Sequence, residues 1–111
     1  MINQCVLVGR IHELPEKKVS SSGTVYASFI MECEKQFRNA DGEIPKEYFR
    51  IQLWRGLAET CCDTCTKGAI VAIKGRLQAN NYESEKGNTV YSCDIVAEKI
   101  SFLVPRVYQE A

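Results

Sequence analysis

Residues 48–55, with the sequence YFRIQLWR, constrain the fold most strongly. In an extended strand, successive side chains point to opposite faces, so this segment separates into two chemically different sides. One side is an apolar stripe of Phe49, Ile51 and Leu53. The other side carries two large aromatic rings, a guanidinium and an amide, on Tyr48, Trp54, Arg50 and Gln52. The segment therefore predicts a strand that covers a core with its apolar side.

The same arrangement returns in residues 70–82. Its predicted core side holds Val71, Ile73 and Leu77, and its other side holds Lys74, Arg76, Gln78, Asn80 and Tyr82. Cations combined with aromatic rings suit the binding of stacked bases and their phosphates. For a single strand, the alternative is a solvated outer face with a chance aromatic, because apolar residues are common on protein surfaces. The repetition favours a binding face.

A chain of 111 residues fits one domain with a core of its own. The hydrophobic content of 45% and the charged content of 25% are those of an ordinary globular protein. The apolar runs have the length of strands, and the first residues lead into a strand without a signal-peptide pattern. We therefore expect an intracellular protein with no membrane segment.

The charge balance excludes binding of nucleic acid through bulk charge alone, because 14 basic and 14 acidic residues cancel. The distribution is uneven, however. Residues 35–56 hold five Lys or Arg against three Asp or Glu, and residues 67–78 hold three basic residues and no acidic one. Any such binding must be local, and both positive segments coincide with the strands that carry the aromatic rings.

The order of predicted elements indicates an all-β fold. Strands are expected over residues 3–11, 24–34, 48–55, 69–78 and 89–104, and a polar connection over 17–23. Residues 35–46 contain Asp41-Gly42, a turn signal that predicts a projecting hairpin loop. Apolar residues at helical spacing predict one helix within 57–65, and Gly68 follows as a stop. This is the element order of an OB-fold, a five-stranded Greek-key barrel with one short helix between the third and fourth strands.

Three motifs carry a resemblance to a known family. These are NQCVLVGR at residues 3–10, FRIQLWRGLAE at 49–59 and KGAIVAIKGRL at 67–77, followed by VAE at 96–98 and FL at 102–103. In this order and at these spacings, the chain resembles the bacterial single-stranded DNA-binding proteins. The resemblance spans about residues 3–103 and implies an OB-fold domain over residues 1–105, with a short extension over 106–111.

The resemblance implies a homo-oligomer, with a tetramer expected before a dimer, that binds single-stranded DNA without strong sequence preference. It places base-stacking aromatics at Phe37, Tyr48, Trp54 and Tyr82, of which only Phe37 depends mainly on the resemblance. The basic residues expected to follow the DNA backbone are Arg10, Lys35, Arg38, Arg50, Arg55, Lys74 and Arg76. Roles in DNA replication, recombination or repair follow, together with possible protein partners from those processes and a cytoplasmic, nucleoid-associated location.

The chain departs from the family pattern in two places. After Leu77 the family often carries basic residues, whereas this chain has Gln78, Asn80 and Asn81. Fewer neutralised phosphates predict a reduced affinity and a weaker salt dependence, since each single-strand phosphate contact contributes about 0.7 to the salt slope. The family also typically continues into a flexible tail that ends in a short acidic peptide, whereas this sequence ends at Ala111. We therefore expect a short form or a shortened chain.

The main alternative is an OB module, similar to primosome accessory proteins, that acts through protein–protein contacts. Tyr, Trp and Arg are also the residues that dominate such interfaces. A third hypothesis is zinc or redox chemistry at Cys61, Cys62 and Cys65, which contain a C-x-x-C spacing. We favour instead a helix that packs small thiols against the barrel, because free cysteine is among the most buried residue types.

Other chemistry finds little support in the sequence. No phosphate-binding glycine loop or nucleophile motif is visible, so we expect neither an enzyme nor a cofactor. His12 is the only histidine, and we expect it at the surface without a partner. The thiols of Cys5, Cys33 and Cys93 fall in predicted strands, where we expect them to behave as small apolar residues.

Overall fold

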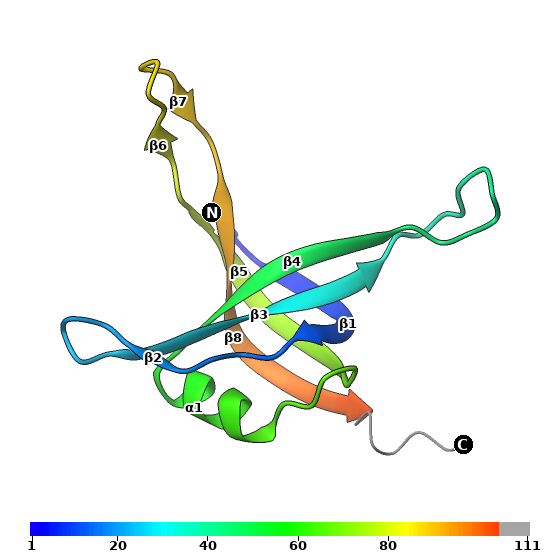
Figure 1. The fold of residues 1–111 in the computed structure, drawn as a ribbon, viewed down its shortest axis with the longest axis horizontal. Helices are drawn as coiled ribbons and strands as arrows, with labels where there is room; N and C mark the ends of the chain where they lie inside the picture. The colour runs from blue at the N-terminus through cyan, green and yellow to red at the C-terminus, as the bar shows by residue number, and fades with distance from the viewer. Residues whose placement is uncertain (105–111) are drawn as a thin grey trace.

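The computed structural model of the protein describes residues 1–104. The expected extension over 106–111 therefore lies outside the described residues, and the domain limits stay a prediction. Five long strands and one helix form the body of the molecule (Figure 1). They are β1 (Cys5–Glu13), β3 (Val25–Glu34), β4 (Lys46–Trp54), α1 (Arg55–Thr64), β5 (Ile70–Ala79) and β8 (Cys93–Val104).

The five long strands close into a barrel. The sheet order is β1-β5-β8-β4-β3-β2, and an additional pairing of β1 with β3 closes the ring. The β4–β8 pair is parallel, and the other pairs are antiparallel. The helix lies between β4 and β5, the third and fourth of the long strands. The predicted OB-fold, with its helix at this point, is confirmed.

The core lies inside the ring and under α1. Ile51 and Leu53 are fully buried and Phe49 is partly buried, as the alternation of that segment predicts. The inward residues of β3, Ala27, Phe29, Met31 and Cys33, complete a buried stripe opposite them. The helix contributes Ala58 and Cys61 to the same cluster and packs mainly against β3. Burial of the apolar side of β4 leaves its polar and aromatic side on the outside.

Three short strands extend the molecule beyond the barrel as hairpins. The first, β2 (Lys18–Val19), pairs with β3, so the predicted polar connection over 17–23 contains a strand. The others, β6 (Tyr82–Glu83) and β7 (Thr89–Val90), pair with each other. In Figure 1 the β2–β3 hairpin, the β3–β4 loop and the β6–β7 hairpin project in three different directions from the barrel.

Three sequence predictions near the β6–β7 hairpin are wrong. Leu77 was expected in the core, but 44% of it is exposed, because this end of β5 runs out of the barrel toward the hairpin. The strand expected over residues 89–104 is interrupted at Tyr91 and Ser92, so that β7 belongs to the hairpin and β8 to the barrel. Cys93, at the start of β8, is consequently exposed and does not pack in the core as the small apolar residue that the sequence predicted.

The described residues contain one α-helix, and at ten residues it is too short to cross a bilayer.

Candidate nucleic-acid interface

The outer face of the β3–β4 ribbon carries most of the side chains that the sequence assigned to a binding face. The two strands are paired along their whole length, and the register places an outward residue of β3 opposite each outward residue of β4. The five outward pairs are Tyr26–Trp54, Ser28–Gln52, Ile30–Arg50, Glu32–Tyr48 and Glu34–Lys46. The ribbon therefore presents Trp54 at one end, Tyr48 towards the other and Arg50 between them.

One end of this ribbon holds an aromatic pair. The rings of Tyr26 and Trp54 have centroids 5.5 Å apart, and their planes are inclined by 32°. Trp54 is 41% exposed although it is the last residue of β4. The helix starts at the next residue, Arg55, whose φ of 57° turns the chain sharply at that point. The Trp54 side chain therefore remains on the surface beside the start of α1.

Towards the other end of the ribbon, Tyr48 lies beside a histidine from β1. The ring centroids of Tyr48 and His12 are 4.8 Å apart, and His12 Nδ1 is 3.8 Å from Glu32 Oε1. Lys46 Nζ lies 3.4 Å from the other carboxylate oxygen of Glu32. The prediction that His12 has no partner is therefore wrong, because closure of β1 onto β3 brings the imidazole to this face.

The β3–β4 loop carries three of the predicted residues. Phe37 is exposed at 61%, and Lys35 Nζ lies 5.8 Å from the centre of its ring. The Arg38 guanidinium donates a hydrogen bond of 2.8 Å to the Gly42 carbonyl. Asn39 Oδ1 accepts hydrogen bonds of 3.0 Å from two backbone N–H groups further along the loop. These local bonds, with positive φ at Gly42, give the predicted projecting hairpin loop its shape.

Tyr82 lies on a different hairpin from the other aromatics. It pairs with Val90 in the β6–β7 ribbon and is 57% exposed. The tip of this ribbon is held by the Ser84 hydroxyl, which accepts a 3.2 Å hydrogen bond from the Asn88 N–H. The expected strand over residues 69–78 ends before Tyr82, in agreement with the end of β5 at Ala79, and Tyr82 belongs to the separate two-stranded ribbon.

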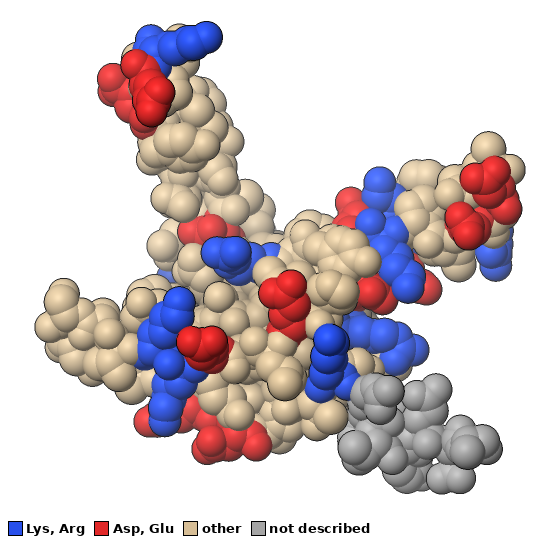
Figure 2. Space-filling model, viewed as in Figure 1, with Lys and Arg blue, Asp and Glu red and all other residues tan. Residues whose placement is uncertain are grey.

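The other five predicted basic residues, apart from Lys35 and Arg38 of the loop, fall into three environments. Arg50 and Lys74 are exposed, Arg50 on the β3–β4 ribbon and Lys74 on the outer face of β5. Arg10 and Arg76 already have protein partners: Arg10 Nη1 donates to the Gly68 carbonyl at 3.2 Å, and Arg76 Nε lies 3.7 Å from Glu98 Oε2. Arg55 lies at the start of α1. Figure 2 shows basic and acidic side chains interspersed on the visible face, in agreement with the zero net charge.

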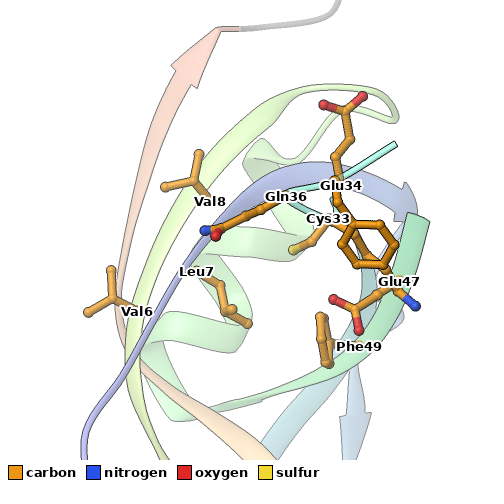
Figure 3. Close-up of a pocket in the computed structure, with 10 residues that line it drawn as sticks. Val6, Leu7, Val8, Cys33, Glu34, Gln36, Glu47 and Phe49 are labelled. Atoms are coloured by element: carbon orange, nitrogen blue, oxygen red, sulfur yellow. The ribbon is translucent and has the colours of Figure 1, made fainter. Parts of the chain in front are cut away.

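A groove of about 560 Å³ opens between the first half of β1 and the end of β3. Residues 5–9 of β1 pair only with β5, since the pairing with β3 begins at Arg10. In Figure 3, Leu7 points to the side of Phe49, whereas Val6 and Val8 point away from it. Val6 and Val8 are exposed at 65% and 56%. The open edge of β1 and its apolar outward side chains are distinct from the aromatic face of the β3–β4 ribbon.

The thiols of α1 and of Cys65, the residue that follows its end, belong to the packing of the helix. Cys61 is fully buried, and Cys62 and Cys65 are partly buried. A hydrogen bond with Cys61, together with burial, raises the pKa of the Cys65 thiol strongly, and burial raises the pKa of Cys62. Within residues 1–104, no three His, Cys, Asp or Glu side chains are placed to hold a metal ion. A thiol with a raised pKa is a weak nucleophile at neutral pH, which applies to Cys62 and Cys65. The hydrogen bond with Cys65 lowers the pKa of Cys61, but the Cys61 side chain is fully buried.

Sequence reasoning missed three residues of this face: Tyr26, Lys18 and His12. Tyr26 stands out of phase with the buried residues of its strand, which is a usable signal, but its position beside Trp54 depends on the β3–β4 register. Lys18 reaches the same row because β2 pairs with β3 there. Nothing in the local sequence around His12 indicates that its imidazole contacts Tyr48.

Comparison with known proteins gives a consistent result. The family model for the single-strand binding protein family matches residues 2–103. The single-stranded DNA-binding protein B of Bacillus subtilis is 36% identical over 111 residues, which is 100% of this chain and 98% of that protein. A single-stranded DNA-binding protein of Lactiplantibacillus plantarum is 36% identical over 99% of this chain and 55% of its own length. Single-stranded DNA-binding protein 1 of Staphylococcus aureus is 37% identical over 96% of this chain and 68% of its own length.

Proposed function

Because this chain belongs to the single-strand binding protein family, we propose that it binds single-stranded DNA by stacking bases on exposed aromatic rings, without catalysing a reaction. The observation that carries this proposal is the outer face of the β3–β4 ribbon. It exposes Tyr48 and Trp54 on one strand with Arg50 between them, while the apolar side of the same strand is buried. Apolar ring surface exposed to water is unfavourable in free energy, and a base that stacks on the ring covers this surface.

The proposed mechanism separates affinity into stacking and charge. Bases stack on Tyr48 and Trp54 and on the hairpin residues Phe37 and Tyr82, and each stack contributes about 1–3 kcal/mol for any base. The exposed cations Arg50 and Lys74, together with the partly exposed Lys35 on the β3–β4 loop, neutralise phosphates. Duplex DNA hides the faces of its bases inside the stack, so it binds much more weakly. The hairpins that carry Phe37 and Tyr82 project from the barrel (Figure 1). They therefore lengthen the surface along which the DNA strand binds.

The basic residues contribute unequally in this proposal. Arg10 and Arg76 already have partners within the protein, so DNA must replace those contacts to gain a phosphate contact. Arg38 is tied to its own loop, and Arg55 lies at the junction of β4 and α1. Gln78, Asn80 and Asn81, exposed towards the β6–β7 hairpin, add no charge. A modest salt dependence follows.

We further propose that the protein assembles into a homo-oligomer, a tetramer rather than a dimer, through the edge and outward face of β1. The support is the unpaired edge at residues 5–9 with exposed Val6 and Val8 beside it. This surface leaves the β3–β4 ribbon free for DNA. Such an assembly serves replication, recombination and repair in the cytoplasm at the nucleoid, where single strands become exposed and proteins of those processes act.

The decisive experiment uses Trp54, the only tryptophan, as a built-in reporter. Titration with oligo-dT is expected to quench its fluorescence strongly, and added salt is expected to weaken the binding. A duplex of the same length serves as the control and is expected to bind at least tenfold more weakly. Absence of quenching, together with unchanged anisotropy of a labelled oligo-dT, would refute DNA binding and support the alternative of a protein-binding OB module.

A further inference from the structure

We propose that Tyr26 is a base-binding residue that acts together with Trp54, and that the pocket beside them is a subsite for one nucleobase. This inference rests on the proposed binding of single-stranded DNA and adds a contact that the sequence did not assign. Tyr26 and Trp54 come from adjacent strands, β3 and β4, and are directly opposite in the register.

The geometry of the two rings supports a shared platform. Their centroids are 5.5 Å apart, which lies within the range of about 4.5–7 Å for aromatic pairs. The inclination of 32° means that the rings are neither parallel nor edge-to-face. The contact with Trp54 restrains one side of the Tyr26 ring before any ligand arrives, which reduces the entropy cost of binding.

The pocket next to the rings has the size and lining that one base requires. Its volume is about 330 Å³, near the lower end of the range of about 300–1,000 Å³ for small-molecule sites. It is lined by both rings, by polar groups and by two cations: Lys18, Tyr26, Ala27, Ser28, Arg50, Gln52 and Trp54. A flat aromatic ligand that carries an anionic group matches this combination of rings and cations.

The polar groups have separate positions within the pocket. Lys18 continues the Tyr26–Trp54 row on β2, because its register partner is Tyr26. Ser28 and Gln52 face each other in the next row along the ribbon, and Arg50 lies one row further. A base stacked on the rings therefore has a hydroxyl and an amide at its edge, and a cation on either side for the adjoining phosphates. This arrangement connects the Trp54 end of the ribbon to Arg50.

The test measures the affinity for labelled oligo-dT by anisotropy in three variants of Tyr26. Tyr26→Ala is expected to weaken binding about 5- to 20-fold, the lower part of the range for one base stack. Tyr26→Phe keeps the ring and is expected to bind within about twofold of the wild type. Tyr26→Leu keeps apolar bulk without a π-face and is expected to resemble Tyr26→Ala. Wild-type affinity in Tyr26→Ala or Tyr26→Leu would overturn the proposal.

Double mutants locate the effect. If Tyr26 and Trp54 share one base, the double variant Tyr26→Ala/Trp54→Ala loses less affinity for oligo-dT than the product of the two single fold-losses. In Tyr26→Ala/Tyr48→Ala, the two fold-losses of affinity are expected to multiply, because Tyr48 lies three rows away on the ribbon. Independent effects of Tyr26 and Trp54 would contradict a shared subsite.

A matched control and a separate readout complete the design. Val19→Ala changes an exposed residue next to Lys18 that does not line the pocket, and it is expected to leave the affinity unchanged. Thermal unfolding checks that each variant is folded. If the wild type fails to bind oligo-dT, the proposed function itself is wrong. If the wild type binds and Tyr26→Ala binds equally well, only the Tyr26 subsite is refuted.

Discussion

The imidazole of His12 packs against the ring of Tyr48, with centroids 4.8 Å apart and planes inclined by 53°. The two residues come from β1 and β4, which are not neighbours in the sheet order. Strand β3 pairs with both β1 and β4, and its Glu32 is the register partner of Tyr48 and lies 3.8 Å from the imidazole. The contact restrains one side of the Tyr48 ring, and Tyr48 remains 52% exposed.

Removal of this contact is expected to weaken DNA binding although His12 itself is not assigned to DNA. In His12→Ala, the Tyr48 ring gains rotational freedom that binding must then remove, at about 0.5–1.5 kcal/mol per side chain. We expect a two- to tenfold loss of affinity for oligo-dT, and recovery in His12→Phe, which retains an aromatic partner. Equal affinities of His12→Ala and the wild type would show that Tyr48 is oriented without His12.

The salt dependence of binding should distinguish two arginines that the sequence treated alike. Arg50 is exposed on the ribbon and makes no side-chain hydrogen bond or ion pair with the described residues, whereas Arg76 lies 3.7 Å from Glu98 and donates a 3.1 Å hydrogen bond to Gln78. Arg50→Gln is expected to reduce the slope of log K against log[salt] by about 0.7, the value for one single-strand phosphate. Arg76→Gln is expected to change it less. The measurement is a series of titrations at increasing salt, and a larger effect of Arg76 would contradict this order.

Gly75 is expected to tolerate no side chain. A Cβ at this position would collide with the Val96 carbonyl oxygen, a backbone atom on the paired strand β8. The β5–β8 ladder has an irregularity between Lys74 and Gly75 that brings the two backbones together. We therefore expect Gly75→Ala to lower the free energy of unfolding by about 1–3 kcal/mol.

Gly56, in the first turn of α1, is the matched control for Gly75. A Cβ there meets nothing within 4 Å. Gly56→Ala is expected to leave the stability unchanged or to raise it by about 0.5–1 kcal/mol, because alanine is favoured in helices. Urea denaturation of both variants compares them directly. A Gly75→Ala protein as stable as the wild type would mean that β8 moves away without cost.

Stability is expected to decrease at alkaline pH through Cys33. Burial, and then the nearby charge of Glu47, raise the pKa of this thiol in the folded protein. In the unfolded chain the thiol loses its proton near its ordinary pKa of about 8.5. The folded state thus binds more protons in this range, so the free energy of unfolding falls as the pH rises above about 8.

The Cys33→Ala variant isolates that contribution. Its free energy of unfolding is expected to fall less steeply between pH 7 and 9.5 than that of the wild type, whatever its stability at pH 7. Cys93→Ala serves as the control, since Cys93 is exposed, and its pH profile is expected to follow the wild type. Urea denaturation across the pH range measures both, and parallel profiles for Cys33→Ala and the wild type would contradict the assignment.

Much of the fold and part of the candidate site could be predicted from local patterns. The alternation in residues 48–55 predicted that Ile51 and Leu53 are buried and that Tyr48 and Trp54 are exposed, and the structure agrees. The helix and the long strands lie within a few residues of their expected positions. The predicted burial of Leu77 was wrong because the alternation of side chains continues along a strand after the strand has left the core. Local spacing carries no information about where a barrel ends.

The apolar face of each strand follows from the amino-acid sequence alone, because side chains alternate along any extended chain regardless of its neighbours. Which outward residues meet depends on how the strands pair in the folded protein. Tyr26 lies beside Trp54 through the β3–β4 register, and His12 reaches Tyr48 through the closure of β1 onto β3. These contacts join residues far apart in the chain, so they depend on strand pairing and barrel closure. Pairing and closure are set by the burial of the apolar faces of all the strands in one common core.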